Sequence, residues 1–310
     1  MTWEPDHSVE AALNHAAGLV QFDGNSWCTG DTHRGTDAAD LASALYERWY
    51  TQPSKSAGPV SRDPSLHHAS LLNPLRAAHA SAARLSGGWV VTSVNPAGGV
   101  AAMRGDAGRV AACGDFVQRV RVGVPPAPGE PVDLVERLDH LDAERGLWWT
   151  YSDPPPTATI GRVYFNVRAA TAPRALHHIT AALNGVAFQL KCPVVPDAYR
   201  RVDAMVLYHA RDARDVVLAA LNDAWPALGP LLDPAVPPLT GFVRPGLAIA
   251  DEFEGGRSYG ESRCALLADA MIACGDRWTG LDADAKRRVL LDGLATAGLD
   301  VDTPWRETPS

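Results

Sequence analysis

Apolar residues in the first part of the chain are spaced as in amphipathic helices. They recur three or four positions apart over 37–50, directly after Thr36, a residue type that favours helix N-caps. A second helical pattern covers 65–85, where Pro74 should kink or divide the helix. The first sixty residues are therefore predicted to be helical.

The pattern changes between 88 and 124, where short apolar or alternating runs are separated by Gly, Pro, Asn and Asp. We interpret these runs as antiparallel strands, over 89–94, 109–113 and 116–124. The stiff proline segment at 153–156 predicts a subdomain boundary. Residues 1–155 would form a helical and β-rich N-terminal subdomain, and residues 156–310 a C-terminal α+β subdomain that carries the functional site.

Strands and helices alternate in the second half of the chain. The patterns predict strands at 162–168, 186–192 and 202–208, helices at 172–183 and 212–224, an extended segment at 240–250, a glycine loop at 254–260, and helices at 262–273 and 282–297. The fold class expected from this order is α+β, with mixed, largely antiparallel sheets and flanking helices.

Composition places the chain among ordinary globular proteins. It has 310 residues, of which 46% are hydrophobic and 21% charged, enough for one large domain or two smaller ones. No apolar run approaches the roughly 18 residues that cross a membrane, and the first residues lack the pattern of a signal peptide. We therefore expect a cytoplasmic location and no membrane partner.

The sequence contains no recognisable cofactor or metal motif. Five scattered cysteines never form a C-x-x-C pair, and adjacent histidines such as His177 and His178 point to different sides of a helix. Motifs for nucleotide binding, zinc peptidases and calcium loops are also absent. We expect neither a metal nor an organic cofactor.

The charge of the chain is uneven. The formal net charge is −8, which disfavours a nucleic-acid partner because phosphate backbones need a positive field. Residues 162–263 nevertheless hold 11 basic and 10 acidic residues. A local cationic pocket for a small anion is compatible with that balance.

Lysine is rare in this chain, since 25 of the 28 basic residues are arginine. One of the three lysines, Lys191, alternates with apolar residues on a predicted strand. Arginine keeps its proton in proteins, whereas a lysine that lies beside other cations can lose its proton and act as a base. The pattern favours a base at Lys191, with a lysine that extends into solvent from an edge strand as the alternative.

A second polar group follows closely along the chain. The strand predicted at 202–208 comes after a short connection, so it should pair antiparallel with the Lys191 strand. Arg201 and Asp203 would then share one face and approach Lys191, with Tyr208 further along. A structural ion pair and a core tyrosine are the alternatives.

The glycine loop before the predicted helix at 262–273 admits two functional interpretations. Residues 256–260 match the G-x-S-x-G nucleophile elbow of α/β-hydrolases. That fold requires a catalytic histidine after the serine in the chain, and no histidine follows Ser258. The loop also fits an anion-binding turn in which backbone N–H groups, Arg257 and Arg263 converge on a phosphate. We favour the phosphate interpretation.

Several of these segments resemble the HopA-type effector family, whose actinobacterial members are similar to the lyase components of class V lanthipeptide and thioamitide biosynthesis. The resemblance is specific over about 162–267 and weak at 46–50 and 148–151. Tyr259 stands where many relatives have Phe. The matching segments are 161–167, 188–191, 199–208, 242–246 and 257–264.

The resemblance implies β-elimination from a precursor peptide of ribosomal origin. A separate phosphotransferase-like kinase would phosphorylate Ser or Thr in the core of that peptide, and recognition of its leader would keep it bound. This protein would then expel phosphate to leave dehydroalanine or dehydrobutyrine. The protein would therefore be a carbon–oxygen lyase with two partners, the kinase and the precursor peptide.

The chemistry of elimination assigns roles to the candidate residues. A neutral base must take a weakly acidic Cα proton while cations stabilise the developing charge, which fits Lys191. Asp203 would orient a cation, and Tyr208 or His178 would protonate the leaving oxygen. The expected phosphate and substrate ligands are Arg201, Arg257 and Arg263, supported by Arg162, Arg244, Asn166 and Ser258.

A non-catalytic module that binds a phosphopeptide or the kinase is the competing expectation. Such a module would keep the arginines but would not need a lysine that loses its proton. Phosphate release from a phosphorylated precursor separates the two classes.

Overall fold

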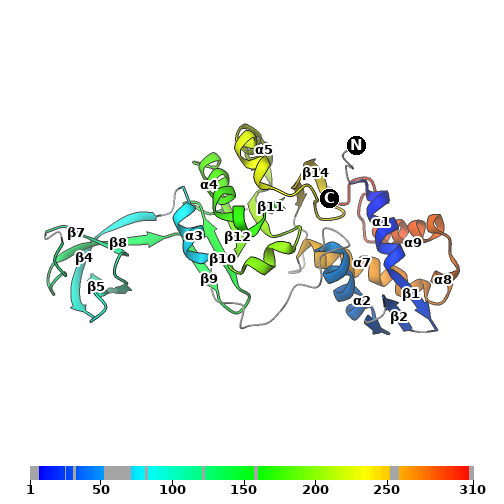
Figure 1. Ribbon diagram of the computed structural model, residues 1–310, viewed down its shortest axis with the longest axis horizontal. Helices are drawn as coiled ribbons and strands as arrows, with labels where there is room; N and C mark the ends of the chain where they lie inside the picture. The colour runs from blue at the N-terminus through cyan, green and yellow to red at the C-terminus, as the bar shows by residue number, and fades with distance from the viewer. Residues whose placement is uncertain are drawn as a thin grey trace. The chain divides into compact units, whose positions relative to one another are not determined.

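The computed structural model describes residues 7–24, 26–30, 33–51, 71–80, 83–120, 123–156, 160–251 and 258–306. The chain forms two compact units, the first made of Met1–Ala80 with His140–Ser310 and the second of Ser81–Asp139. Each unit contains β-sheet, and the first also contains the helices (Figure 1). The α+β prediction is confirmed. These two units differ from the halves predicted on either side of residue 155, which falls inside the first unit.

A seven-stranded sheet forms the centre of the first unit, with the strand order β14-β15-β11-β13-β12-β10-β9. Its strands from β14 to β10 pair antiparallel in succession. Their bounds are β9 Asp139–Asp142, β10 Leu147–Tyr151, β11 Ile160–Phe165, β12 Phe188–Pro193, β13 Met205–Ala210, β14 Gly241–Arg244 and β15 Leu247–Asp251. The predicted pairing of the Lys191 strand with the next strand is confirmed.

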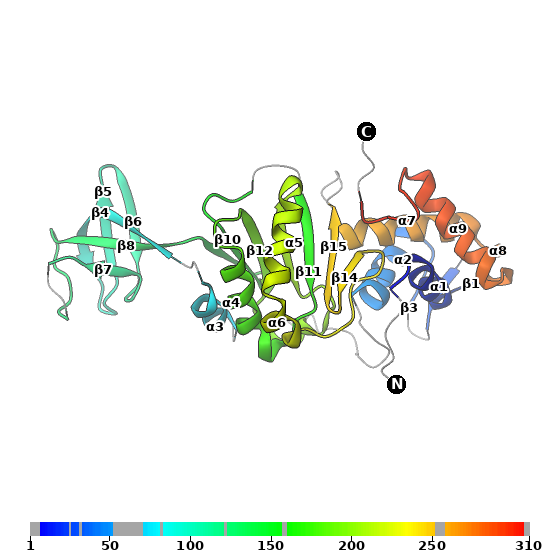
Figure 2. The ribbon, with the colours of Figure 1, turned by 90° about the horizontal axis from the view of Figure 1, so that it is seen from above.

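One face of this sheet packs on helices that follow its strands in the chain. Phe165, Leu190 and Leu207 lie in this core, where Leu176 of α4 covers them. Pro173 stands in the first turn of α4, where its missing N–H costs nothing. Figure 2 shows α4, α5 and α6 along the sheet. The bounds are α4 Ala172–Ala182, α5 Arg214–Asp223 and α6 Trp225–Leu228, with the short 3₁₀ turns η3 Ala169–Thr171, η4 Pro196–Arg200, η5 Arg211–Ala213 and η6 Gly229–Leu231.

The opposite face of the sheet packs on helices from both ends of the chain. Tyr164, Val206 and Tyr208 of the sheet share a core with Leu41 of α2 and Leu267 of α7. Asp37 caps α2, and Ser258 and Glu261 form a capping box at the start of α7. The bounds are α1 Val9–Leu19, α2 Ala38–Leu45, η1 Tyr46–Tyr50, α7 Tyr259–Cys274, α8 Arg277–Gly280 and α9 Ala283–Thr296. Helix α3, Leu72–Ala78, belongs to the other face, where Leu72 and Leu75 share the core that contains α4.

The N-terminal region departs from its prediction. A three-stranded sheet interrupts the helices, so the expectation that the first sixty residues are helical is wrong there. These strands are only three or four residues long and each gives too short a periodic signal. They are β1 Val20–Asp23, β2 Ser26–Thr29 and β3 His33–Gly35. The helix predicted over 65–85 lies partly outside the described residues, and its last positions belong to a strand.

The second unit is a five-stranded sheet with the order β6-β5-β4-β8-β7. A small core that contains Trp89, Val100 and Val132 supports it. The predicted strand at 89–94 is confirmed, while the strands predicted over 109–113 and 116–124 end at Ala111 and Gln118. The bounds are β4 Ala83–Val94, β5 Val100–Arg104, β6 Ala107–Ala111, β7 Phe116–Gln118 and β8 Pro131–Arg137.

Candidate functional site

Lys191 lies in the middle of the seven-stranded sheet, on the face that packs on α2, η1 and α7. It stands opposite Trp149 of β10 and Val206 of β13, so the three side chains share this face. The Nζ atom lies 5.9 Å from the centre of the Trp149 ring. Lys191 is the only lysine of the seven strands, and it is partly exposed.

An aromatic stack connects Lys191 to a buried arginine. The Trp149 ring stacks on Tyr208 with centroids 5.5 Å apart, and the Arg162 guanidinium lies 5.2 Å from the centre of the Tyr208 ring. Arg162 is directly opposite Tyr208 in the ladder between β11 and β13. Arg162 is 5% exposed, so its charge acts from beneath the tyrosine.

Arg201 and Asp203 form an ion pair beside Lys191. The Nε and Nη2 atoms of Arg201 each donate to one carboxylate oxygen of Asp203, at 2.8 Å. Burial acts to raise the pKa of Asp203, but Arg201 and Lys191 outweigh it and hold this pKa below the usual value. Asp203 stays ionised at neutral pH. Both residues precede β13 in a turn, whereas the sequence placed them on the strand itself.

Tyr46 joins this ion pair to the helical side of the site. Its hydroxyl accepts a hydrogen bond from Nη2 of Arg201 at 2.7 Å, so its own proton is available to another acceptor. Burial and the nearby Asp203 carboxylate raise the pKa of Tyr46 to about 12. Tyr46 begins the π-helical turn η1, and such turns are frequent at functional sites.

Three further tyrosines fill the space between η1, α7 and the sheet. Tyr50 lies 6.4 Å from Tyr259, and Tyr259 lies 6.5 Å from Tyr164, measured between ring centroids. Burial raises the pKa of all three hydroxyls, that of Tyr259 to about 12. These groups keep their protons at neutral pH, and the Tyr259 hydroxyl donates to the Leu239 carbonyl.

Arg263 is the deepest cation of the site. It is 1% exposed, and its Nε and Nη2 atoms both donate to the Pro304 carbonyl, at 3.1 and 2.7 Å. Its guanidinium lies 4.5 Å from the centre of the Tyr259 ring. Arg263 thus holds the chain near residue 304 in place, and it adds a positive charge to the buried side of the site.

We call this assembly the cation–tyrosine cluster. It contains four cations and one carboxylate, so its field favours an anion. Lys191, Arg201 and Tyr46 are its partly exposed members, and the other seven are buried. Its members are Tyr46, Tyr50, Arg162, Tyr164, Lys191, Arg201, Asp203, Tyr208, Tyr259 and Arg263.

Three predicted site residues lie elsewhere. His178 is on α4, which packs on the opposite face of the sheet from Lys191. Arg244 bonds to Asn222 and covers the Trp225 ring at 5.2 Å, also on that side. Asn166 donates to the Ala235 carbonyl and supports a turn. The sequence could not show this because it does not reveal which face of a sheet each helix covers.

The glycine loop is described only at its end. Arg257 lies outside the described residues, so the predicted anion-binding turn stays a prediction. Ser258 is the N-cap of α7, and its hydroxyl accepts from the backbone N–H of Glu261 at 3.3 Å. This role explains the serine of the G-x-S-x-G match without a nucleophile.

Sequence reasoning missed most of the tyrosines and Trp149 as members of the site. Tyr46 lies on the apolar stripe of the helix predicted over 37–50, a pattern typical of core residues. Tyr50, at the end of that helix, is buried. The run of aromatic residues over 46–50 was the available signal.

Within the described ranges no three His, Cys, Asp or Glu side chains gather as metal ligands would. None of the described helices is long and apolar enough to cross a membrane.

Comparison with known proteins identifies the family. The HopA1 effector protein family matches residues 149–306, which is half of the chain and holds every member of the cation–tyrosine cluster except Tyr46 and Tyr50. The chain belongs to the HopA1 effector protein family. No curated protein gives a significant match to this HopA1 member.

Two solved structures resemble this HopA1 member. An effector protein from Pseudomonas syringae pv. tomato strain DC3000 is 13% identical, with a TM-score of 0.50 over 96% of each chain. An effector protein from Pseudomonas syringae pv. syringae strain 61 is 20% identical, with a TM-score of 0.42. That match covers 53% of this chain and 63% of the effector. The first similarity shows a shared fold.

Proposed function

We propose that this HopA1 member is a phosphoserine/phosphothreonine lyase. It would eliminate phosphate from a kinase-phosphorylated precursor peptide to form dehydroalanine or dehydrobutyrine, in lanthipeptide or thioamitide biosynthesis. The observation that carries the proposal is the position of Lys191, the only lysine of the sheet, within the cation–tyrosine cluster, whose other members include three arginines and protonated tyrosines. The sequence resemblance supports the same reaction.

The reaction breaks two bonds in the substrate. The neutral amine of Lys191 takes the Cα proton of the phosphorylated residue, and the C–H electron pair forms the Cα=Cβ double bond. The Cβ–O bond breaks, and its electrons leave with the phosphate group. The products are the dehydrated residue, inorganic phosphate and a protonated Lys191, which returns its proton to water.

The cluster supplies charge and protons at the points where the substrate needs them. Arg201 keeps the correct orientation because Asp203 holds two of its nitrogens. Its remaining N–H groups and the Tyr46 proton can donate to phosphate oxygens, which accept such donors strongly. Tyr208, on the same face as Lys191, is a candidate to protonate the departing oxygen. Arg162 and Arg263 stabilise negative charge from below.

The decisive experiment measures phosphate release by this protein alone. A synthetic phosphothreonine or phosphoserine peptide is incubated with the pure protein, and the dehydrated product is identified by its mass and by its reaction with a thiol. We expect one phosphate released for each dehydrated residue. Binding of the phosphopeptide without any release would support a non-catalytic binding module and contradict the lyase proposal.

The proposal includes a separate phosphotransferase-like kinase as partner. A kinase bound to this protein would deliver the phosphopeptide at a high effective concentration. We expect dehydration of the unmodified precursor only when kinase, ATP and this protein are present together. Equal rates with tethered and separated kinase would contradict the complex but not the elimination.

A further inference from the structure

A groove of about 620 Å³ lies between α2 and α7, next to the cation–tyrosine cluster. Small side chains of both helices give it an apolar surface, while polar residues surround them. The lining residues are Ala38, Ala39, Ala42, Ser43, Tyr46, Glu47, Glu261, Ala265 and Asp269. Among these lining residues only Tyr46 belongs to the cluster, and the proposed elimination gives no role to the others.

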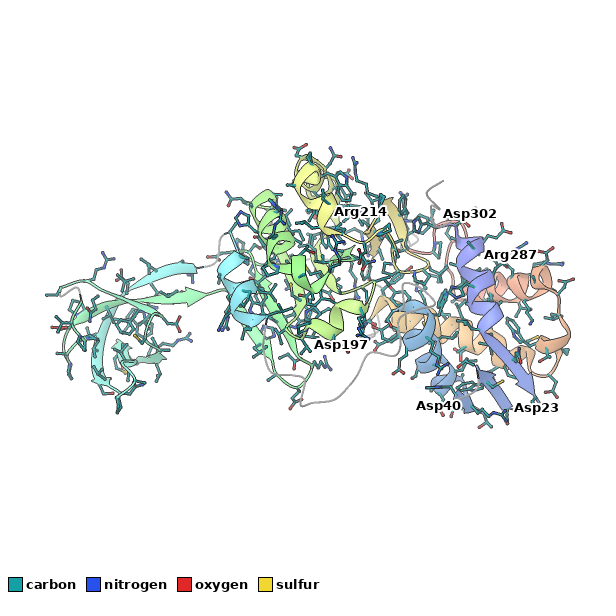
Figure 3. All side chains as sticks on the ribbon, viewed as in Figure 1. Asp23, Asp40, Asp197, Arg214, Arg287 and Asp302 are labelled. Carbon is teal, nitrogen blue, oxygen red and sulfur yellow. The ribbon has the colours of Figure 1, made fainter. Side chains whose placement is uncertain are left out.

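The groove has a one-sided charge. Glu47, Glu261 and Asp269 contribute carboxylates, and none of the described lining residues is Lys, Arg or His. Asp37 and Asp40 add negative charge at the start of α2, where Figure 3 shows Asp40. The lining residues that the structure describes therefore carry a negative formal charge, which attracts cations.

The shape of the groove suits long cationic side chains. Alanines leave room along the apolar surface, and the aliphatic parts of lysine and arginine pack on such surfaces while their charged ends reach polar groups. Glu47 lies on η1, which continues α2, and Asp269 lies on α7. A chain bound in the groove would therefore meet a carboxylate on each side.

The groove is continuous with the proposed catalytic residues. Tyr46 lines the groove, and its hydroxyl also accepts the hydrogen bond from Arg201. The negative groove and the positive cluster thus meet at one side chain. If the phosphate group of a peptide bound at the cluster, the residues next to the phosphorylated residue would lie in the groove.

We infer that the groove binds a segment rich in lysine or arginine that flanks the phosphorylated residue of the substrate peptide. This inference rests on the proposed function and deepens it, because it assigns a class of substrate: peptides with positive charge close to the phosphate. Anionic membranes and nucleic acids would be repelled. A second copy of this chain is disfavoured because each copy carries −8.

The test compares two peptides and three proteins. Two phosphothreonine peptides differ only in flanking residues, three lysines in one and three glutamines in the other. Wild-type protein is compared with the double variant Glu47→Gln, Asp269→Asn, and with Asp223→Asn as control. Asp223 is an exposed carboxylate of α5, a helix on the opposite face of the sheet. Circular dichroism verifies that all three fold.

We expect the wild type and the control to show a KM about tenfold lower for the lysine peptide, and this preference should weaken in high salt. The double variant should lose the preference with little change in kcat. Binding of unphosphorylated versions, followed by fluorescence anisotropy, should show the same order. Equal KM values for the two peptides in the wild type would overturn the inference, and so would a preference that survives in the double variant.

Failure of the groove and failure of the lyase proposal give different results. Phosphate release without a lysine preference overturns the groove assignment and leaves the lyase standing. A lysine preference in binding that the double variant loses, with no phosphate release, supports the groove and overturns the lyase.

Discussion

At position 191, lysine and arginine offer the same charge but different proton chemistry. Lys191→Arg keeps the cation near Trp149 but provides no neutral amine. We expect phosphate release to fall by about 10²–10⁴-fold, the usual loss when a general base is removed, while phosphopeptide binding persists. Single-turnover phosphate release and equilibrium binding measure the two effects.

Lys286 provides the matched control for that substitution. Its Nζ atom also lies over a tryptophan ring, 5.4 Å from the centre of Trp278, but on α9 and outside the cluster. Lys286→Arg should leave phosphate release unchanged. Near-parental release by Lys191→Arg would show that Lys191 only anchors phosphate, and the base would have to be sought at Tyr208.

The carboxylate of Asp203 should contribute to stability in a pH-dependent manner. The pKa of Asp203 lies below its usual value in the folded state, so its contribution is complete above the ordinary pKa of about 3.8 and is lost as pH falls through the folded value. Asp203→Asn should cost about 3 kcal/mol at pH 7 because it leaves Arg201 without its carboxylate.

Urea unfolding of the wild type and Asp203→Asn at several pH values measures this contribution. The difference between the two proteins should shrink below about pH 3.8, where the wild-type carboxylate begins to be protonated in the unfolded chain. A difference that stays constant down to acid pH would show that shape, not charge, makes Asp203 important.

At the scale of elements, the start of α7 depends on a missing side chain. A Cβ atom at Gly260 would lie 2.3 Å from a ring carbon of the buried Tyr50, so only glycine lets α7 approach η1. Gly260→Ala should destabilise the protein by about 1–3 kcal/mol, although alanine favours helices. Gly18, in α1, has nothing within 4 Å of its added Cβ, so Gly18→Ala should not destabilise it.

Thermal unfolding compares these two alanine variants. A stable Gly260→Ala protein would show that η1 and α7 can separate without cost. The contact would then be dispensable for positioning Tyr46 and Tyr259.

Sequence periodicity predicted the positions of the strands that carry the site. It predicted less well which helices and short strands pack on each face of the sheet. The strands β11, β12 and β13 and the helices α4 and α9 lie close to their predicted positions because each has a long, regular pattern. The N-terminal strands are too short for that signal. The π-helical turn η1 also continues a helical pattern, so its change of geometry leaves no mark in the sequence.

The site follows the same division. Lys191, Arg201 and Asp203 could be grouped because adjacent strands are joined by a short connection. Tyr46 is 155 positions away from Arg201 in the sequence, and only tertiary packing brings the two together. His178 was a candidate to protonate the leaving oxygen, but α4 covers the face of the sheet opposite Lys191, and the sequence does not show which face a helix covers.

At the scale of the whole molecule, a buried histidine should make stability depend on pH. His209 is fully buried, and burial lowers its pKa below the usual 6.5. A lowered pKa means that its contribution is complete above about pH 6.5 and is lost as pH falls towards the folded value. We expect the free energy of unfolding to decrease from pH 7 to pH 5.

Urea unfolding across this range, with His209→Gln for comparison, tests that expectation. The variant should show a shallower decrease between pH 7 and pH 5. An equal slope in both proteins would assign the effect to other groups, such as His178, whose pKa burial also lowers.

The second unit leaves and re-enters the first through neighbouring strands, since Ala83 pairs with Arg137 near the two ends of residues 81–139 (Figure 1). A segment whose ends lie together can be exchanged as a cassette, because a short turn can close the gap that it leaves. No member of the cation–tyrosine cluster lies in residues 81–139. Residues 81–139 can therefore change in sequence or length during evolution without any change in the residues of the cation–tyrosine cluster.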